Sequence, residues 1–435
     1  MKKMFSLFLV LMLALSLATG AMAEETIDWA SRRLDEQVTL TFMIDRDQSL
    51  DGFEAIFKDI EEKLNIKTEL ELRPGGTEGD NLVKSRLATG DMADLCAYNS
   101  GSLFQVLNPS VYFVDLSDQP YADNLDVSFK NAVSVDGKLY GIPSGATQTG
   151  AWMYNKEVHD SLGLSIPTTW DELLANCETI KQAGLIPVIG GYKDSWTSQL
   201  IVLADQHNIV HEYPEFVKDF DAGVAKFSNT PAALRSFEKL NEIYTKGYIN
   251  EDLNSTSYDM ALEMLVEGQG VYYPMLSFAL SYVEENYPEQ INNIGSFGQP
   301  GDDPDYHGVS VWLPGGVYIA NSCQNVDAAK LWLEYYISQE ATNTLAQYSK
   351  PTGPYAVIGM EVDVEMYQAA IELQPFFDSG NTAAALEFES PLKGPNLPQI
   401  TQECGSGIST AVEAAEKYDL DITKQAVQLG MTGWD

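Results

Sequence analysis

The sequence predicts an α/β protein built as two lobes, because strands and helices alternate along the chain in two separate series. In the first series, residues 38–44 and 66–72 alternate apolar and polar side chains, as half-buried strands do. Between them, residues 53–64 repeat apolar side chains at helical spacing. A second series starts after Tyr154. Both series have the strand–helix order of a parallel sheet covered by helices, so we expect one sheet in each lobe.

The first series continues with a predicted helix at 81–88, which leads through Gly90 and Asp91 into an apolar run at 95–98 that we interpret as a third strand. Further along, Asp136 and Gly137 predict a turn, followed by a short extended segment. Pro143 stands in that segment and has no backbone N–H to donate. We therefore expect the segment to stay out of the centre of a sheet.

In the second series a helix is predicted over 169–183, because Thr169 and Glu172 have capping-box spacing and Gly184 follows. The later strands are predicted at 185–189, at 271–275, from 309, and at 317–320. The later helices are predicted from Thr230-Pro231, in a segment ending at Gly268, over 326–348 and from 362 onward. Residues 295–308, rich in Gly, Pro and Asp, are predicted as the one long loop-like region.

The first 23 residues have the pattern of a cleaved signal peptide. Two lysines precede an apolar run at 5–17, and Ala21-Met22-Ala23 forms an A-x-A cleavage site. The run is too short for a membrane span, and no cysteine near the site would carry a lipid. We therefore expect an exported protein in the periplasm, at the cell surface or outside the cell.

The net charge of −37 at pH 7 argues against nucleic acid and anionic membranes as partners. Four cysteines remain after processing, at wide spacings that fit no metal pattern: Cys96, Cys177, Cys323 and Cys404. We favour buried free thiols over disulfides, although export permits disulfides.

Signals for an enzyme, a metal or an organic cofactor are absent from the sequence. There is no G-x-S-x-G elbow, no H-E-x-x-H motif and no P-loop. Only His207 and His211 share helical spacing, and a zinc site there is improbable because no Glu accompanies them as a general base. Residue type alone still allows a glycosidase, which needs only two carboxylates.

Several segments resemble family 1 extracellular solute-binding proteins, the ligand-capturing components of ATP-driven importers, and above all the carbohydrate-binding branch. The matching segments, in the order typical of that family, are LATGDMAD at 87–94, the block at 136–174, LVEGQGVY at 265–272, Gly315-Gly316 and NVDAAKLW at 325–332. This sequence departs from the family pattern at Ala93, where proline is usual, and at the end of 265–272.

The resemblance implies a type II periplasmic-binding-protein fold, with two α/β lobes, a hinge of several segments and a ligand cleft between the lobes. Crossings between the lobes are expected near 147–151, 312–316 and 354–360. The implied domains are a signal peptide at 1–23, an N-terminal lobe at 24–147 and 312–357, and a C-terminal lobe at 148–311 and 358–435.

Five candidate ligand-binding residues follow from chemistry and position. Sugar binding requires aromatic faces and convergent polar groups. Trp196, in the polar setting DSWTS, is the first candidate. Tyr98 and Asn99 follow one predicted strand and Asp45 and Arg46 follow another, at the carboxyl ends where open α/β sheets bind ligands. Alternatives remain open: core packing for Trp196, strand-end packing for Tyr98, and a solvated surface turn for Asp45 and Arg46.

Three further candidates rest on the resemblance. Gln148 and Phe278 lie where maltodextrin-binding members have an acidic contact and a stacking Trp, and Trp312 precedes the Gly-Gly crossing. Core or hinge packing is the alternative for the two aromatic residues, and a local loop hydrogen bond is the alternative for Gln148.

We therefore predict a non-catalytic, monomeric receptor that captures a sugar or oligosaccharide and delivers it to the membrane permease of an ABC importer, with no cofactor. Two alternatives stay open: a binding protein for a polyamine or peptide, and a secreted carbohydrate-active enzyme. The identity, linkage and length of the sugar, and the way the protein stays near its permease, are not determined by the sequence.

Overall fold

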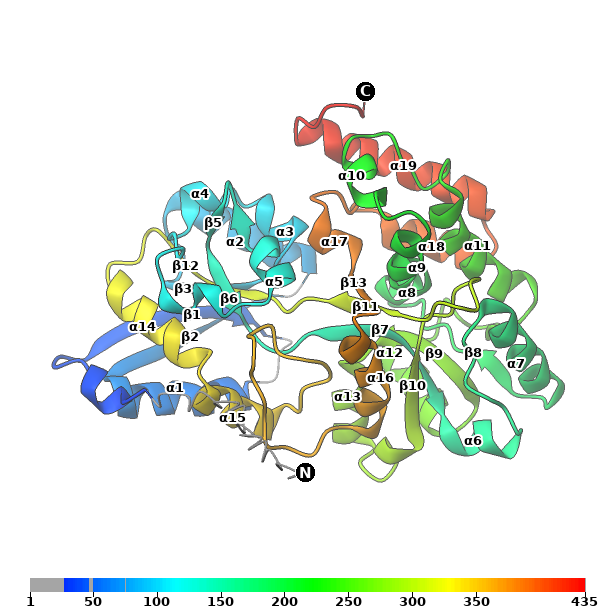
Figure 1. Ribbon diagram of the computed structural model, residues 1–435, viewed down its shortest axis with the longest axis horizontal. Helices are drawn as coiled ribbons and strands as arrows, with labels where there is room; N and C mark the ends of the chain where they lie inside the picture. Colours follow the sequence, from blue (N-terminus) through cyan, green and yellow to red (C-terminus); the bar gives the residue numbers. More distant parts are fainter. Residues whose placement is uncertain (1–26, 47–49, 75, 435) are drawn as a thin grey trace, which may run out of the picture.

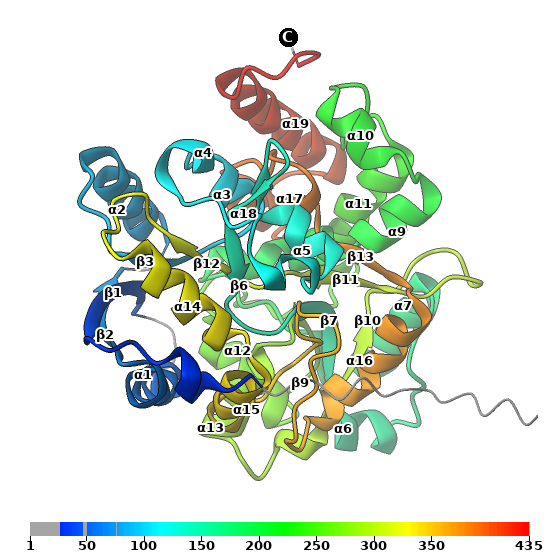
Figure 2. The same ribbon diagram turned by 60° about the vertical axis from the view of Figure 1, so that its left-hand side comes forward.

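Two sheets, each covered by helices, form the left and right lobes of the protein in Figure 1. The structure is a computed structural model that describes residues 27–46, 50–74 and 76–434. The predicted signal peptide, residues 1–23, lies outside the described residues. Figure 2 shows the same two lobes after a rotation, with the connecting segments between them.

The sheet of the first lobe has the order β2-β1-β3-β12-β6, formed by β2 (Ile66–Arg73), β1 (Val38–Asp45), β3 (Leu95–Tyr98), β12 (Gly316–Ile319) and β6 (Gly141–Pro143). Strand β1 is parallel to both β2 and β3, whereas β12 runs antiparallel to β3 and β6. Helices α1 (Asp51–Leu64) and α2 (Gly76–Thr89) connect the parallel strands. The predicted strand–helix–strand–helix–strand series is therefore confirmed.

The short extended segment with Pro143 also behaves as predicted. Asp136 and Gly137 both have positive φ, at 53° and 74°, and close a hairpin between β4 (Ser134–Val135) and β5 (Lys138–Leu139). Positive φ at both turn residues matches the twist of a two-residue hairpin. Strand β6 then pairs only at the edge of the sheet, where the missing N–H of Pro143 costs little.

The sheet of the second lobe has the order β13-β11-β7-β9-β8, with β10 also paired to β7. Its strands are β13 (Thr382–Ala384), β11 (Val309–Trp312), β7 (Gln148–Asn155), β9 (Gly270–Leu276), β8 (Ile186–Val188) and β10 (Ile294–Gly298). The main helices of this lobe include α7 (Trp170–Gln182), α11 (Pro231–Thr245) and α12 (Tyr258–Val266). Helix α7 carries the predicted capping box, in which Thr169 and Glu172 each bond the other's backbone.

Three segments connect the sheets, and hydrogen bonds join them to each other. The chain passes between the lobes at 144–147, between β6 and β7, at 313–315, between β11 and β12, and at 349–367, between α15 (Gln339–Tyr348) and α16 (Gln368–Ser379). Ser144 N donates to Gly315 O at 2.9 Å, and Thr147 N donates to Pro354 O at 2.8 Å. The first crossing therefore starts a few residues before the predicted position. The exact lobe boundaries that we predict at residues 147, 312 and 357 stay predictions.

Two predictions about local structure were wrong. Residues 295–308 were expected to form a loop, but β10 occupies the first part of this segment and pairs antiparallel with β7. Gly295 allows this pairing, because a Cβ there would lie 2.4 Å from the Tyr154 ring. The region after residue 362 was expected to be helical, but it contains β13, which pairs in parallel with β11.

The remaining elements cover the sheets or connect them. The helical region predicted at 326–348 divides into α14 (Val326–Tyr336) and α15 (Gln339–Tyr348), because Ser338 caps the second helix through Ala341 N. The others are η1 (Trp29–Arg32), α3 (Ser102–Gln105), α4 (Pro109–Tyr112), η2 (Pro120–Asp123), α5 (Val127–Ala132), α6 (Lys156–Ser161), η3 (Ser195–Gln199), α8 (Leu200–Ala204), α9 (Gln206–Glu212), α10 (Phe216–Asp221), α13 (Ala279–Asn286), η4 (Ile291–Asn293), α16 (Gln368–Ser379), α17 (Leu386–Glu389), α18 (Leu397–Gly405) and α19 (Ala411–Gln428).

All four cysteines are free and buried, as predicted. Burial raises the pKa of the Cys96 thiol to about 12, so this thiol stays protonated and behaves as a small apolar side chain. Trp152 is also buried, as expected for a residue of a central strand, and its Nε1 donates to Gln299. Within the described part of the chain, the helices are all too short or too polar to cross a membrane.

A buried ion pair lies in the core of the second lobe. Lys239 Nζ is 2.6 Å from Asp205 Oδ1, and both side chains are about 1% exposed. Lys239 also donates to Pro300 O at 3.0 Å, and Asn208 Nδ2 donates to the same Asp205 oxygen at 2.7 Å. These hydrogen bonds replace part of the hydration that both charges lose on burial.

His207 lies beside this ion pair and is fully buried. Its Nε2 is 3.1 Å from Gln299 O and donates to it, while Nδ1 has no hydrogen-bond partner among the described residues. Burial, together with the positive charge of Lys239, holds the pKa of His207 well below its ordinary value. The imidazole is therefore neutral in the folded protein.

We expect this histidine to make the protein less stable in acid. As the pH falls below about 6.5, the unfolded chain binds a proton at His207 that the folded chain does not bind. Between pH 7 and pH 5 this removes at most about 2 kcal/mol from the free energy of unfolding. Urea denaturation at both pH values measures the loss, and the His207→Gln variant should show a smaller loss. An equal loss in the variant contradicts the assignment.

Candidate functional site: a cavity between the lobes

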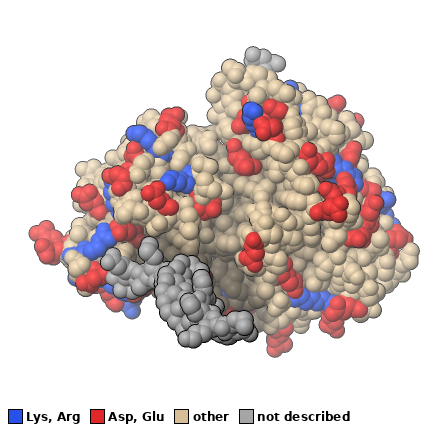
Figure 3. Space-filling model, viewed as in Figure 1, with Lys and Arg blue, Asp and Glu red and all other residues tan. Residues whose placement is uncertain are grey.

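A cavity of about 550 Å³ lies between the two lobes, next to the crossing segments. The surface is hollowed between the lobes in Figure 3, and acidic side chains are spread over the visible face of both lobes. The first lobe contributes the carboxyl ends of β1 and β3, and the second contributes β7, the end of β9, η3 and α8. The carboxyl ends of strands in open α/β sheets are where ligands bind.

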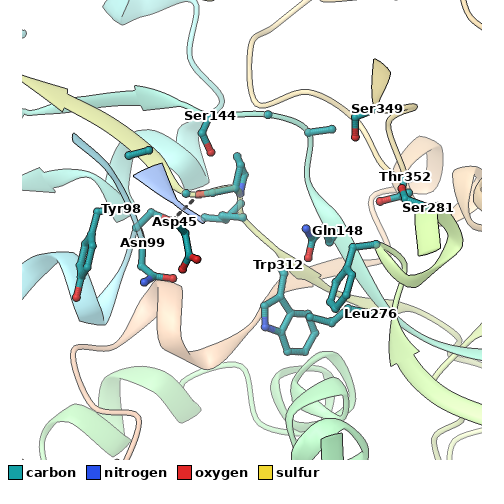
Figure 4. Close-up of a pocket in the computed structure, with 18 of the residues that line it drawn as sticks. Asp45, Tyr98, Asn99, Ser144, Gln148, Leu276, Ser281, Trp312, Ser349 and Thr352 are labelled. Carbon is teal, nitrogen blue, oxygen red and sulfur yellow. Dashed lines mark hydrogen bonds between the residues drawn. The ribbon is translucent and has the colours of Figure 1, made fainter. Parts of the chain in front are cut away.

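Seven of the eight predicted ligand-binding residues line this cavity, namely Asp45, Tyr98, Asn99, Gln148, Trp196, Phe278 and Trp312. They come from segments far apart in the sequence, and Figure 4 shows Asp45, Tyr98 and Asn99 on one side of the cavity with Gln148 and Trp312 on the other. Arg46 is exposed and does not line the cavity; its backbone N donates to Arg73 O at 3.0 Å.

Trp196 stands on η3 and is half-buried. Its ring centroid lies 5.4 Å from that of Tyr258 and 6.1 Å from that of Phe278, so these rings hold it in place. The sequence indicated little packing reason for this tryptophan, but the structure provides one. A held aromatic ring at a cavity wall offers a flat apolar surface at low entropic cost.

The first lobe brings a cluster of polar groups to the cavity. Arg73 Nη1 is 3.4 Å from Asp45 Oδ2, and the Arg73 guanidinium lies 5.5 Å from the Tyr98 ring centroid. The Tyr98 hydroxyl donates to Asp80 at 2.9 Å. Burial and the neighbouring Asp80 carboxylate raise the pKa of Tyr98, so the phenol stays neutral. With only 3% of its surface exposed, Tyr98 forms part of the wall rather than a projecting platform.

The second lobe contributes a paired carboxylate behind Trp312. Glu387 accepts a hydrogen bond from Trp312 Nε1 at 2.9 Å and another from Lys393 Nζ. The indole is 8% exposed, which agrees with the packing role considered for it from the sequence, although it also lines the cavity. Glu387 therefore fixes the ring and neutralises Lys393 at the cavity surface.

Small polar side chains from the crossing segments and from α13 complete the lining. Figure 4 shows Ser144, Ser281, Ser349 and Thr352 around Gln148. Thr352 Oγ1 accepts a hydrogen bond from Ser277 Oγ at 3.0 Å, which connects the third crossing to the end of β9. These hydroxyls can both donate and accept hydrogen bonds.

Several lining residues were not found by sequence reasoning. They are Arg73, Tyr348, Tyr355, Glu387 and Phe388. Tyr355 lies in the third predicted crossing, so its position was the one available signal. Phe388 packs against the cores of both lobes, and α17 lies against α3 and α5 of the first lobe, a contact visible in Figure 1. No local sequence pattern predicts this contact, because its partners are far apart in the chain.

The histidines do not form a metal centre. His211 Nε2 is 2.9 Å from Asp303 and its ring stacks on Tyr306, whereas His207 is enclosed in the core. Among the residues that the structure describes, no group of three or more His, Cys, Asp or Glu is arranged to hold a metal ion.

Residues 46–343 match the family model described as bacterial extracellular solute-binding protein. Two curated proteins are similar over most of their length. The multiple sugar-binding protein of Streptococcus mutans serotype c is 24% identical over 77% of this chain and 79% of its own length. The melibiose/raffinose/stachyose-binding protein MelE of Bacillus subtilis is 22% identical over 87% of this chain and 88% of its own length.

Solved structures share the fold. A chitin oligosaccharide binding protein superposes with a TM-score of 0.75, at 21% identity, over 91% of this chain and 99% of that chain. The solute-binding protein RafE in complex with raffinose gives a TM-score of 0.71, at 19% identity, over 88% of this chain and 98% of that chain. The two-lobe α/β architecture predicted from the sequence is therefore confirmed.

Proposed function

This chain belongs to the bacterial extracellular solute-binding protein family, and from that premise we propose that it captures a neutral sugar or oligosaccharide for import. The curated relatives at 22–24% identity are sugar-binding proteins by name. In this proposal the protein acts outside the cytoplasm as a monomer and delivers its ligand to the membrane permease of an ABC importer. Export would depend on the predicted signal peptide at 1–23.

The charge balance of the cavity is the observation that carries the proposal. Five charged residues stand among the described residues of the lining: Asp45, Arg73, Lys350, Glu387 and Lys393. Asp45 pairs with Arg73, Glu387 pairs with Lys393, and Lys350 pairs with Glu284. A protein of net charge −37 thus has a cavity with no excess of carboxylates among these residues. A polyamine would need such an excess, whereas a neutral ligand would not.

The shape and polarity of the lining also suit a carbohydrate. Trp196 and Phe278 provide apolar ring faces, and Asn99, Gln148 and the serine hydroxyls provide donors and acceptors. A pyranose has an apolar C–H face and a ring of hydroxyls, so it needs this combination. The hydrogen-bonded crossings would act as the hinge about which the lobes close on the sugar.

In this proposal the protein is a receptor and not an enzyme. The two carboxylates of the lining, Asp45 and Glu387, are each engaged by a cationic side chain. A glycosidase needs one carboxyl group held protonated as a general acid and a second held as base or nucleophile. Neither a metal nor an organic cofactor enters the proposed mechanism.

We expect purified protein to be stabilised by specific sugars in a thermal-shift screen. The panel contains raffinose, stachyose, melibiose, galactose, and chitin and xylan oligosaccharides, with putrescine and short peptides as competitors. At a sugar concentration 100-fold above Kd the gain in stability is about 2.7 kcal/mol, which raises Tm measurably. Stabilisation by putrescine or peptides alone contradicts the proposal, and release of smaller sugars from the panel indicates an enzyme.

A further inference from the structure

We infer that Gln199 is a specificity-determining residue that binds a hydroxyl group of the sugar held against Trp196. This inference rests on the proposed function and deepens it, because it states which hydrogen-bonding group the ligand must offer. Gln199 lines the cavity and is 9% exposed. Its Oε1 is buried and has no hydrogen-bond partner among the described residues.

The local backbone explains why Gln199 stands beside Trp196. Both residues belong to η3, a 3₁₀-helix, in which there are three residues per turn. Residues three apart therefore lie above one another, and Trp196 and Gln199 both line the cavity. One turn of helix thus presents a flat ring and an amide to the same ligand.

The side chains of Thr197 and Ser198, in the same turn, point into the protein. Thr197 Oγ1 donates to Gly191 O at 3.0 Å, and Ser198 Oγ donates to Pro398 O at 3.0 Å. Both are buried and neither lines the cavity. Thr197 and Ser198 are therefore hydrogen-bonded inside the second lobe, whereas the amide oxygen of Gln199 at the cavity has no donor among the described residues.

An unpaired buried carbonyl is costly, since a polar group without a hydrogen bond loses the partner that water would give it. A bound sugar hydroxyl can supply the missing donor, because the terminal amide of Gln turns easily about χ3. The amide then favours a sugar that has a hydroxyl group, rather than a hydrogen atom, on the ring carbon next to Gln199. Sites of this kind reject analogues that lack the hydroxyl.

The test compares the wild-type protein with Gln199→Met, which keeps the length of the side chain and removes the amide. Isothermal titration uses the raffinose, stachyose or chitin oligosaccharide that binds the wild type. The expected result is an affinity about 10-fold lower in the variant, while the Tm without sugar stays the same or rises, because a buried unpaired oxygen is gone. If Gln199 has only a structural role, the variant should bind the sugar as tightly as the wild type and have a lower Tm without sugar.

Thr197→Val is the matched control from the same turn, because it removes a hydroxyl that is already paired. It should lower the Tm and leave the sugar affinity unchanged. Monodeoxy analogues of the bound sugar then identify the recognised hydroxyl: one analogue should bind the wild type more weakly and bind Gln199→Met as the parent sugar does. Unchanged affinity in Gln199→Met overturns this inference alone, whereas a wild type that binds no carbohydrate overturns the proposed function as well.

Discussion

Replacing Trp196 with alanine should lower sugar affinity roughly 30-fold, which corresponds to about 2 kcal/mol for the loss of a central aromatic anchor. Trp196 is held by Tyr258 and Phe278 and lines the cavity, so its ring is pre-positioned for the apolar face of a pyranose. Isothermal titration with the sugar found in the thermal-shift screen measures the change.

The same substitution also removes packing against Tyr258, so the Tm without ligand should fall slightly in Trp196→Ala. Trp196→Phe is the control, because it keeps a flat ring between the same neighbours and should retain most of the affinity. If Trp196→Ala binds the sugar as tightly as the wild type, Trp196 is not the stacking residue, although the family assignment is unaffected.

Replacing Lys239 with methionine should lower the free energy of unfolding by about 3–5 kcal/mol, more than the other single substitutions considered. The substitution leaves the Asp205 carboxylate buried without its cation, 1% exposed in the core of the second lobe. Methionine fills a similar volume, so the loss reports the unpaired charge rather than a cavity. Urea denaturation at pH 7 measures the change in the free energy of unfolding.

Two comparisons separate this charge effect from a general effect of losing a lysine. Lys218 forms an ion pair with Glu215 at 2.7 Å, but both side chains are more than half exposed, so Lys218→Met should leave the free energy of unfolding almost unchanged. The double variant Lys239→Met/Asp205→Asn removes both charges and should recover most of the lost stability. A double variant as unstable as the single one would contradict the buried-charge explanation.

The elements that sequence patterns predicted well are those with local causes. The capping box at Thr169 and Glu172 starts α7, and the Asp136-Gly137 turn closes the β4–β5 hairpin. Both depend on residues within four positions of each other, so the local sequence contains the whole signal. The alternation in β1 and β2 is likewise a property of consecutive residues.

The missed strands depend on partners far away in the chain. Strand β10 contains two glycines and looked like a loop, but pairing with β7 about 140 residues earlier gives it hydrogen bonds. Strand β13 is only three residues long and exists because β11 offers it an edge. In both cases tertiary pairing overrides weak local preference.

The part of the site at the carboxyl ends of strands could be predicted from the sequence, because the position of a residue along the chain shows whether it lies at a strand end. Asp45 and Tyr98 are the last residues of the parallel strands β1 and β3, Asn99 follows β3, and all three line the cavity. Arg46 follows the same strand as Asp45 but is exposed, because successive residues of an extended chain point to opposite sides. Glu387 was missed because its role depends on Trp312, 75 residues earlier.

The sequence by itself determined the α/β class, the order of most elements and the family, and seven of the eight residues that it indicated as ligand-binding line the cavity. Periodicity, caps, turns and strand ends are set by neighbouring residues, so the sequence contains these signals. Only the tertiary structure decided which charges neutralise one another in the cavity, which rings hold Trp196, and that the amide oxygen of Gln199 is left unpaired. These features arise where segments distant in the chain meet, and interaction energy between such segments depends on distance and burial that no local pattern contains.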